Sequence, residues 1–207
     1  MKTCRLLMIF LLFAVGRIMA NGNNTFRLID TTNGLPDNEV RGLLALPDGR
    51  LGIRSSAGMS LFDGCEFRTF APVSNDEYKI GYRSSLPYMY VDSQQTVWLK
   101  EPGKLLAFDL KTERYRRDFR QQFLAMGVKE KVLDFFVDDA KDYWLVTAAG
   151  KLLLSHGGQC GRIPVHTKGL KDVCRVGNAA WLVYGDGLLV SVDLATCRVV
   201  SLSLIHI

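Results

Sequence analysis

Residues 31–70 read TTNGLPDNEVRGLLALPDGRLGIRSSAGMSLFDGCEFRTF, and this stretch decides the fold. Apolar runs at residues 40–46, 51–53 and 59–62 are separated by Pro-Asp-Gly, Ser-Ser-Ala-Gly and Asp-Gly, residue types that favour tight turns. A fourth run, residues 66–70, follows the last turn. Four short strands within about 35 residues predict one small antiparallel sheet. Because such a sheet cannot bury both of its faces alone, it needs neighbouring sheets.

The same four-strand pattern recurs three more times along the chain. One position in each second strand aligns the units, and it is occupied by Gly52, Trp98, Trp144 and Trp181. The spacings are 46, 46 and 37 residues. A glycine follows five or six residues later in every unit, namely Gly58, Gly103, Gly150 and Gly187. A period of about 40 residues with four strands is typical of propeller blades. A large aromatic side chain can wedge between adjacent blades, and the glycine permits a tight hairpin.

The sequence therefore predicts an all-β chain, a partial β-propeller of about four four-stranded blades, within residues 21–201. The expected blades are residues 31–70, 81–119, 130–166 and 169–201. A β-sandwich with similar strands is the alternative, but four units in step favour the propeller. Residues 71–79 read as a polar join, residues 119–126 as one short helix, and residues 25–29 could form an additional strand.

The first twenty residues have the features of a signal peptide. Lys2 and Arg5 precede an almost unbroken apolar run at residues 6–15, and Ala20 is a small residue for cleavage. The run is too short to span a bilayer. We therefore expect the mature protein to begin near Asn21, with an uncleaved anchor or a buried strand as the alternative.

Composition excludes a strongly basic nucleic-acid-binding domain. The 207 residues are 48% hydrophobic and carry a net charge of +5. Three of these charges lie in the first twenty residues, so about +2 remains in the mature chain. The basic run at residues 111–120 interleaves aromatic and cationic side chains, but Glu113 and Asp118 interrupt it. We interpret it as a solvated outer strand.

Cysteines give no clear disulfide framework. Cys4 leaves with the signal peptide, and the others are Cys65, Cys160, Cys174 and Cys197. Their spacing shows neither a paired pattern nor a zinc motif, although export would permit disulfides. The sequence does not fix their disulfide state, and it favours free, mostly buried thiols.

Three motifs of the first unit resemble the two-component regulator propeller repeats. Residues 34–40 resemble the Gly-Leu-Pro-Ser-Asn-x-Val opening of that family, residues 48–53 its Gly-x-Leu-Trp-Ile-Gly-Thr core, and residues 58–64 its Gly-Leu-x-x-Tyr-Asp-Gly close. Gly52 stands where the family has Trp, and Arg54 where it has Gly. The resemblance covers roughly residues 25–201 and is weaker in the later units.

The resemblance implies the periplasmic sensor region of a hybrid two-component histidine kinase that responds to glycan fragments. It also implies a homodimer at full length and an anchor in the inner membrane through a part of the protein beyond this sequence. The last six residues, 202–207, match the translation of a transposon-end sequencing adaptor, so we expect this tail to be an artefact and the natural protein to continue.

No catalytic constellation, metal site or cofactor site is expected in this chain. His156, His166 and His206 have no carboxylate or cysteine at ligand spacing and read as lone surface residues. Asp138, Asp139 and Asp142 could suggest a calcium loop, but they lack the glutamate that would complete one, so turn chemistry is favoured.

Binding is therefore the expected activity. Loop-proximal candidates for contact with a sugar are Tyr88, Tyr90, Arg54, Lys100 and Tyr184, for which core packing is an equal explanation. No residue is assigned to a binding site. A secreted propeller enzyme acting on glycans would need paired carboxylates or a His/Tyr cluster at the axis. A protein-binding propeller scaffold would show broad apolar patches on one face.

Overall fold

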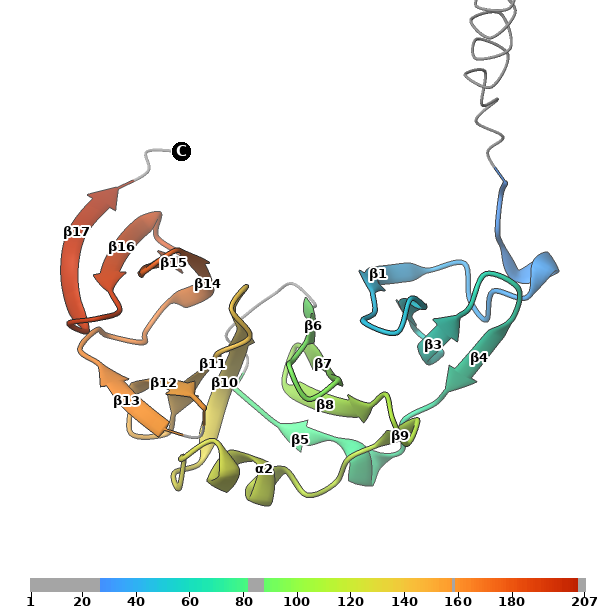
Figure 1. The fold of residues 1–207 in the computed structure, drawn as a ribbon, viewed down its shortest axis with the longest axis horizontal. Helices are drawn as coiled ribbons and strands as arrows, with labels where there is room; N and C mark the ends of the chain where they lie inside the picture. Colours follow the sequence, from blue (N-terminus) through green and yellow to red (C-terminus); the bar gives the residue numbers. More distant parts are fainter. Residues whose placement is uncertain (1–26, 82–87, 158, 205–207) are drawn as a thin grey trace, which may run out of the picture.

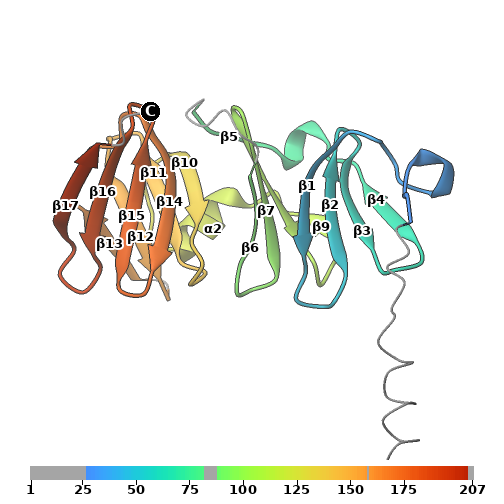
Figure 2. The same ribbon diagram turned by 90° about the horizontal axis from the view of Figure 1, so that it is seen from above.

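The computed structural model describes residues 27–81, 88–157 and 159–204. The expected signal peptide, residues 1–20, lies outside these ranges, as do residues 205–207. In the described part, four antiparallel sheets follow one another as sectors of an open arc (Figure 1). Seen from above, the sheets stand side by side with their strands in similar directions (Figure 2). The predicted partial β-propeller with four blades is confirmed.

Blades 1, 3 and 4 each contain four strands in sequence order. Blade 1 contains β1 (Val40–Ala45), β2 (Leu51–Ser55), β3 (Gly58–Phe62) and β4 (Phe67–Phe70). Blade 3 contains β10 (Val132–Val137), β11 (Tyr143–Thr147), β12 (Leu152–His156) and β13 (Gln159–Ile163). Blade 4 contains β14 (Leu170–Val176), β15 (Ala179–Tyr184), β16 (Leu188–Asp193) and β17 (Arg198–Leu204).

Blade 2 departs from this plan at its outer edge. It contains β6 (Tyr88–Val91), β7 (Thr96–Glu101) and β8 (Lys104–Asp109), whose outer edge is shared by two short strands. β5 (Tyr78–Lys79) pairs with the start of β8, and β9 (Arg114–Tyr115) pairs with its end. Residues 71–79 are thus not only a polar join, because they also contain the 3-10 helix η2 (Ser74–Asp76).

The fourth strand of blade 2 is shorter than the sequence predicts. The expected strand extended to Phe119, but β9 ends at Tyr115 and Phe119 begins the helix α2 (Phe119–Ala125). Phe119 and Phe123 are buried against Trp98 and Phe135, so burial of these rings in the interface between blades 2 and 3 favours the helix. The predicted short helix is confirmed.

The start of the described chain holds no strand. Residues 27–30 are irregular and precede the 3-10 helix η1 (Thr31–Asn33), so the additional strand expected at residues 25–29 is absent from the part that can be seen. Across residues 27–204, apart from the gaps at 82–87 and 158, no helix has the length and hydropathy needed to cross a bilayer.

A separate apolar cluster fills each interface between consecutive blades. The cluster between blades 1 and 2 includes Met59, Val97 and Phe108. Trp98 joins the cluster between blades 2 and 3, and Trp144 the one between blades 3 and 4. The core is therefore divided into layers between sheets, as expected for blades that cannot bury both faces alone.

The anchor tryptophans confirm the predicted wedge at two interfaces. Trp98 is 1% exposed, and its ring centroid lies 4.5 Å from that of Phe135 in blade 3. Trp144 is fully buried, on the side of blade 3 that faces blade 4. Trp181 lies at the same position of blade 4, with no following blade in the described residues to cover it, and it is only half-buried.

Blade 1 fills the tryptophan position in another way. A Cβ atom added to Gly52 would lie 2.9 Å from Met59 Cε, 3.1 Å from Met89 Cε and 3.3 Å from Leu46 Cδ2. Two methionines and a leucine thus occupy the volume of the missing indole. Methionine suits such a gap because its side chain is unbranched and flexible.

The predicted glycine hairpins are also confirmed. The glycine after the second strand has a positive φ in all four blades: Gly58, Gly103, Gly150 and Gly187. Gly58 is the most restricted, because a Cβ atom there would lie 2.4 Å from the Phe70 carbonyl oxygen. A larger residue would force β3 and the end of β4 apart.

The four cysteines in the described part of the chain are free thiols. The expectation that they are mostly buried is wrong. Cys65 and Cys174 are exposed, while Cys160 and Cys197 are half-buried. Cys65 follows a surface turn, and Cys174 lies on the side of blade 4 that no described blade covers.

Candidate functional site

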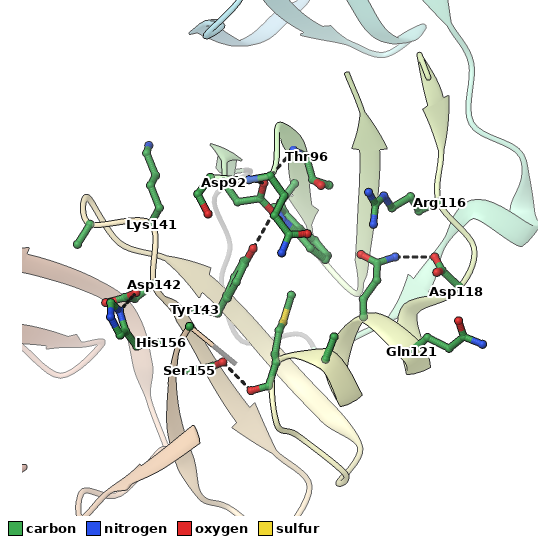
Figure 3. A pocket seen from close by; sticks show the side chains of 18 residues that line it. Asp92, Thr96, Arg116, Asp118, Gln121, Lys141, Asp142, Tyr143, Ser155 and His156 are labelled. Carbon is green, nitrogen blue, oxygen red and sulfur yellow. Dashed lines mark hydrogen bonds and ion pairs between the residues drawn. The ribbon is translucent and has the colours of Figure 1, made fainter. Parts of the chain in front are cut away.

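A cavity of about 570 Å³ opens between blades 2 and 3, beside α2 (Figure 3). Its walls come from the β6–β7 turn, the β10–β11 turn, the end of β12 and the segment from residue 116 to residue 126. Most of its lining side chains are polar. The lining residues include Asp92, Ser93, Gln94, Trp98, Arg116, Asp118, Gln121, Gln122, Met126, Lys141, Asp142, Tyr143, Ser155 and His156.

Asp92 builds the wall that blade 2 contributes. Its Oδ1 accepts hydrogen bonds from the backbone N–H groups of Gln94 and Thr96, which fixes the turn after β6. Its Oδ2 accepts from Trp98 Nε1 at 2.8 Å and from Tyr143 Oη at 2.8 Å. One buried carboxylate therefore holds its own turn, the indole of its own blade and a phenol of the next (Figure 3). Burial and the Asp92 charge raise the pKa of Tyr143.

Blade 3 repeats the same turn and adds a charged cluster. Asp138 Oδ1 accepts from the Asp142 N–H, and Asp138 Oδ2 accepts from Trp144 Nε1 at 3.0 Å. Asp142 Oδ1 lies 2.6 Å from His156 Nδ1, and Asp142 Oδ2 accepts from Arg175 of blade 4. The predicted turn chemistry is confirmed for Asp138, whereas the Asp142 carboxylate binds side chains of β12 and β14 instead.

His156 corrects the expectation of a lone surface histidine. Its side chain is 79% exposed, but it pairs with Asp142 from 14 residues away. His166 Nδ1 lies 3.2 Å from the Lys168 carbonyl oxygen, and His206 lies outside the described residues.

The third wall comes from α2 and the residues before it. Gln122 Nε2 donates to Asp118 Oδ1 at 2.9 Å, one helical turn earlier. Ser155 Oγ donates to the Met126 carbonyl oxygen at 2.5 Å and ties β12 to the end of the helix. The guanidinium of Arg116 is turned to Asp109, at 2.7 Å from Nη2 to Oδ2.

Several polar side chains of the cavity have no partner within the described part of the chain. They are the hydroxyl of Ser93, the amides of Gln94 and Gln121, and the ammonium of Lys141. Neutral donors and acceptors next to an aromatic side chain suit a ligand that carries hydroxyl groups on an apolar ring.

Sequence reasoning did not identify this cavity. Its residues come from four segments of the chain. The turns that blade 2 and blade 3 contribute to its walls lie about 45 residues apart in the sequence. One usable signal was present: an aspartate precedes the anchor tryptophan by six residues in both middle blades, at Asp92 and Asp138.

Three of the five sugar-contact candidates come together, away from the cavity. Tyr88 and Tyr90 in β6 stack with ring centroids 5.8 Å apart, and Lys100 pairs with Tyr88 across β6 and β7. Arg54 lies in β2 with Glu101 as its ion-pair partner, and Tyr184 Oη donates to the His166 carbonyl oxygen at 2.8 Å. All five candidates lie within strands rather than in loops.

Lys100 is the centre of this inner cluster. Its Nζ lies 2.6 Å from Asp134 Oδ1 and 3.6 Å from the centroid of the Phe136 ring. Both charged side chains are at most 2% exposed, and burial lowers the pKa of Lys100 against the opposing effect of Asp134. Lys100 therefore joins blade 2 to blade 3 and is not available to a ligand.

The inner cluster also reaches blade 4. Tyr88 and Asp172 in β14 lie close enough for each to affect the pKa of the other, and burial raises the pKa of that carboxyl. The same pair of facing positions on the first two strands of each blade can be compared. Gly42 faces Arg54 in blade 1 and Tyr88 faces Lys100 in blade 2. Asp134 faces Val146 in blade 3 and Asp172 faces Val183 in blade 4. Arg54 and Lys100 thus occupy one position of consecutive blades, which their spacing of 46 residues could have revealed.

Part of the basic run at residues 111–120 forms internal ion pairs. Glu113 pairs with Arg50 and Arg68 of blade 1, and Arg117 pairs with Asp76. Arg116 pairs with Asp109. These contacts fit the predicted solvated outer edge better than a surface that binds phosphates.

Comparisons with known proteins show likeness of fold. The chain is similar to the extracellular domain of a hybrid two-component system from B. thetaiotaomicron, with a TM-score of 0.56 and 15% identity over 87% of this chain and 26% of that one. It is similar to PorZ, a surface component of the type-IX secretion system of Porphyromonas gingivalis, with a TM-score of 0.57 and 12% identity over 85% of this chain and 24% of that one. What is shared is a propeller.

The same fold occurs in a chain of a nidogen/laminin complex, with a TM-score of 0.50 and 11% identity over 81% of this chain and 64% of that one. No family model and no curated protein matches the sequence. The chain spans about a quarter of the length of the two bacterial structures. At these identities, the comparisons establish the arrangement of the strands, and function must be inferred from the residues of the site.

Proposed function

We propose that this chain is the ligand-sensing propeller of an exported two-component sensor, and that its ligand is a glycan fragment. The cavity between blades 2 and 3 carries this proposal, because unpartnered amides and a hydroxyl line it together with the half-buried ring of Tyr143. Such surroundings suit sugar hydroxyl groups and the apolar face of a sugar ring. The likeness to an extracellular domain of a hybrid two-component system supports the same class of function.

The rest of the proposed protein lies beyond this sequence. A homodimer, an inner-membrane anchor and a histidine kinase would complete the sensor, in which ligand binding shifts a conformational equilibrium that the kinase reads. The residue resemblance of the first blade supports this arrangement.

A glycan-binding measurement tests the proposal. The purified chain is titrated calorimetrically with a panel of neutral disaccharides and with disaccharides that contain a uronic acid. We expect a neutral sugar to bind, and Gln121→Ala to weaken it by up to about tenfold, the loss of one hydrogen bond. Gln159→Ala, at an exposed position of β13 and outside the cavity, is the control. No binding at millimolar sugar, or equal effects of both variants, would contradict the proposal.

Export is tested separately. The signal peptide predicts that the protein recovered from the periplasm of an expressing Gram-negative host begins at Asn21. Intact mass spectrometry reads this directly. A protein retained in the cytoplasm with its first twenty residues would oppose a periplasmic sensor.

A glycan-cleaving enzyme is the second candidate, and one observation favours it. Asp134 and Asp172 converge at the inner strands, close enough for the charge of Asp134 to affect the pKa of Asp172. Paired carboxylates are what glycoside hydrolysis requires. However, Asp134 is buried and ion-paired with Lys100, so it cannot reach a substrate. Release of reducing ends from any panel sugar, lost in Asp172→Asn, would favour the enzyme.

A further inference from the structure

Asp142 is held from two sides by residues of two different blades. Its Oδ1 lies 2.6 Å from His156 Nδ1, on the cavity wall, and its Oδ2 accepts a hydrogen bond from Arg175 Nη1 in β14 of blade 4. The side chain of Asp142 is 7% exposed, whereas that of His156 is 79% exposed. The carboxylate is therefore a buried link between the cavity and the next blade.

Arg175 holds the turn from residue 138 to residue 142 as a unit. Its Nη1 also lies 3.7 Å from Asp138 Oδ2, the atom that accepts the hydrogen bond from Trp144 Nε1. Its Nε donates to the Gly177 carbonyl oxygen at 3.1 Å, which fixes the guanidinium on blade 4. Arg175 does not line the cavity.

The preceding interface uses a neutral donor, and its acceptor is the aspartate at the position of Asp138. Asp92 Oδ2 of blade 2 accepts a hydrogen bond from Tyr143 Oη of blade 3, at 2.8 Å. The contact of Arg175 with Asp142 is an ion pair, whose Coulombic attraction depends on the charge of the acceptor more than a bond from a neutral phenol does. Of these two interfaces, the one between blades 3 and 4 is thus the more responsive to an event at the carboxylate.

We propose that the turn from residue 138 to residue 142 couples occupancy of the cavity to the packing of blade 4, through the carboxylate that His156 and Arg175 share. The proposal rests on the proposed function, since it takes the cavity as the ligand site. A sugar hydroxyl that donates to Asp142, or displaces His156 from it, changes the set of hydrogen bonds in which Arg175 shares that carboxylate. Arg175 is a positioning residue for this site.

Linkage makes the coupling reciprocal. If ligand binding changes the hold of Arg175 on Asp142, then loss of Arg175 must change ligand affinity by the same factor. Arg175 is not part of the cavity wall, and its contacts with Asp138 and Asp142 are the link from it to the cavity. Arg198, an exposed arginine of the same blade, provides a matched control.

Amide hydrogen exchange tests the coupling without ligand. Arg175→Gln is expected to speed exchange of residues 138–143 by about fivefold or more, and His156→Gln to change exchange in β14. Both remote effects should disappear in an Asp142→Asn background, and Arg198→Gln should leave residues 138–143 unchanged. Unchanged exchange at residues 138–143 in Arg175→Gln would overturn the proposal.

The second test measures sugar affinity. It uses the disaccharide that binds in the calorimetric panel. Arg175→Gln is expected to shift its Kd by about fivefold or more, and Arg198→Gln to leave it unchanged. Wild-type affinity in Arg175→Gln would overturn the coupling while leaving the cavity as a sugar site. If no sugar binds, the proposed function fails, and the exchange experiment still decides whether the turn couples the two blades.

Discussion

Trp98 and Asp92, six residues apart, meet through a hydrogen bond of 2.8 Å from indole nitrogen to carboxylate. Trp144 and Asp138 repeat the contact at 3.0 Å in the next blade. The aspartate starts the turn between the first two strands, and the tryptophan fills the gap to the following blade. This pair joins the local turn to the packing between blades, so it connects the sequence repeat to the arc of sheets.

The position of each tryptophan predicts how much stability it contributes. Trp144→Ala should lower the free energy of unfolding by about 3–5 kcal/mol, because it leaves a large cavity in a buried cluster. Trp181→Ala should cost clearly less, since that side chain is half-buried on an uncovered face. Urea denaturation of the two variants measures the difference. Equal losses would show that Trp181 is covered too.

Blade 1 lacks both members of the pair, and its residues predict a coupled substitution. Leu46 takes the place of the aspartate, because its N–H bonds to the Arg50 carbonyl oxygen as Asp92 bonds to Thr96. Gly52→Trp alone should destabilise by about 1–3 kcal/mol through overpacking, and Leu46→Asp alone should bury an unpaired carboxylate. Together with Met89→Ala, which frees volume, the two changes should cost less than the sum of their separate effects.

A double-mutant cycle of Leu46→Asp and Gly52→Trp, in the Met89→Ala background, measures this coupling by chemical denaturation. Strictly additive losses would mean that the indole and the carboxylate do not meet in blade 1. That result would mean that the hydrogen bond between the turn aspartate and the anchor tryptophan is possible only in blades 2 and 3.

The Lys100–Asp134 pair predicts an asymmetry between single and double substitutions. Lys100→Met alone should cost about 3–5 kcal/mol, because Asp134 would remain buried without its counter-charge. Lys100→Met combined with Asp134→Leu should restore most of that loss. Thermal and urea unfolding of the three variants measure it. A single variant as stable as the wild type would place the pair in solvent.

Asp172 predicts a pH dependence with a defined sign. Burial raises its folded-state pKa above the unfolded value, so the folded state binds the extra proton more tightly. The group therefore favours folding below the unfolded pKa, and this contribution is lost as pH rises through the raised value. Asp172→Asn should be more stable than the wild type at pH 7, and the difference should vanish at low pH.

Urea midpoints between pH 3 and pH 7 test this sign. The control is Asp186→Asn in an exposed turn, which should change little over the range. A pH 7 midpoint for Asp172→Asn below that of the wild type would mean that the ionised carboxylate stabilises the fold.

The sequence predicted the sheets because the signals are local. Turn residues and alternating apolar runs lie within each blade, and the Trp–Gly spacing repeats from blade to blade. Blade 2 was predicted less well, since Tyr78 and Phe119 are recruited by burial between blades, which no local pattern encodes. The contacts of Lys100 with Asp134 and of Asp142 with Arg175 join residues 34 and 33 apart, so only the fold reveals them.

Hydrogen exchange of the three indole N–H groups tests the wedge between blades most directly. Two-dimensional NMR of the nitrogen-labelled chain resolves one indole signal for each tryptophan, assigned by substitution to phenylalanine. We predict slow exchange for Trp98 and Trp144, whose indoles are buried and bonded to Asp92 and Asp138, and fast exchange for Trp181. Equal exchange rates at all three would contradict the arrangement of blades described for this chain.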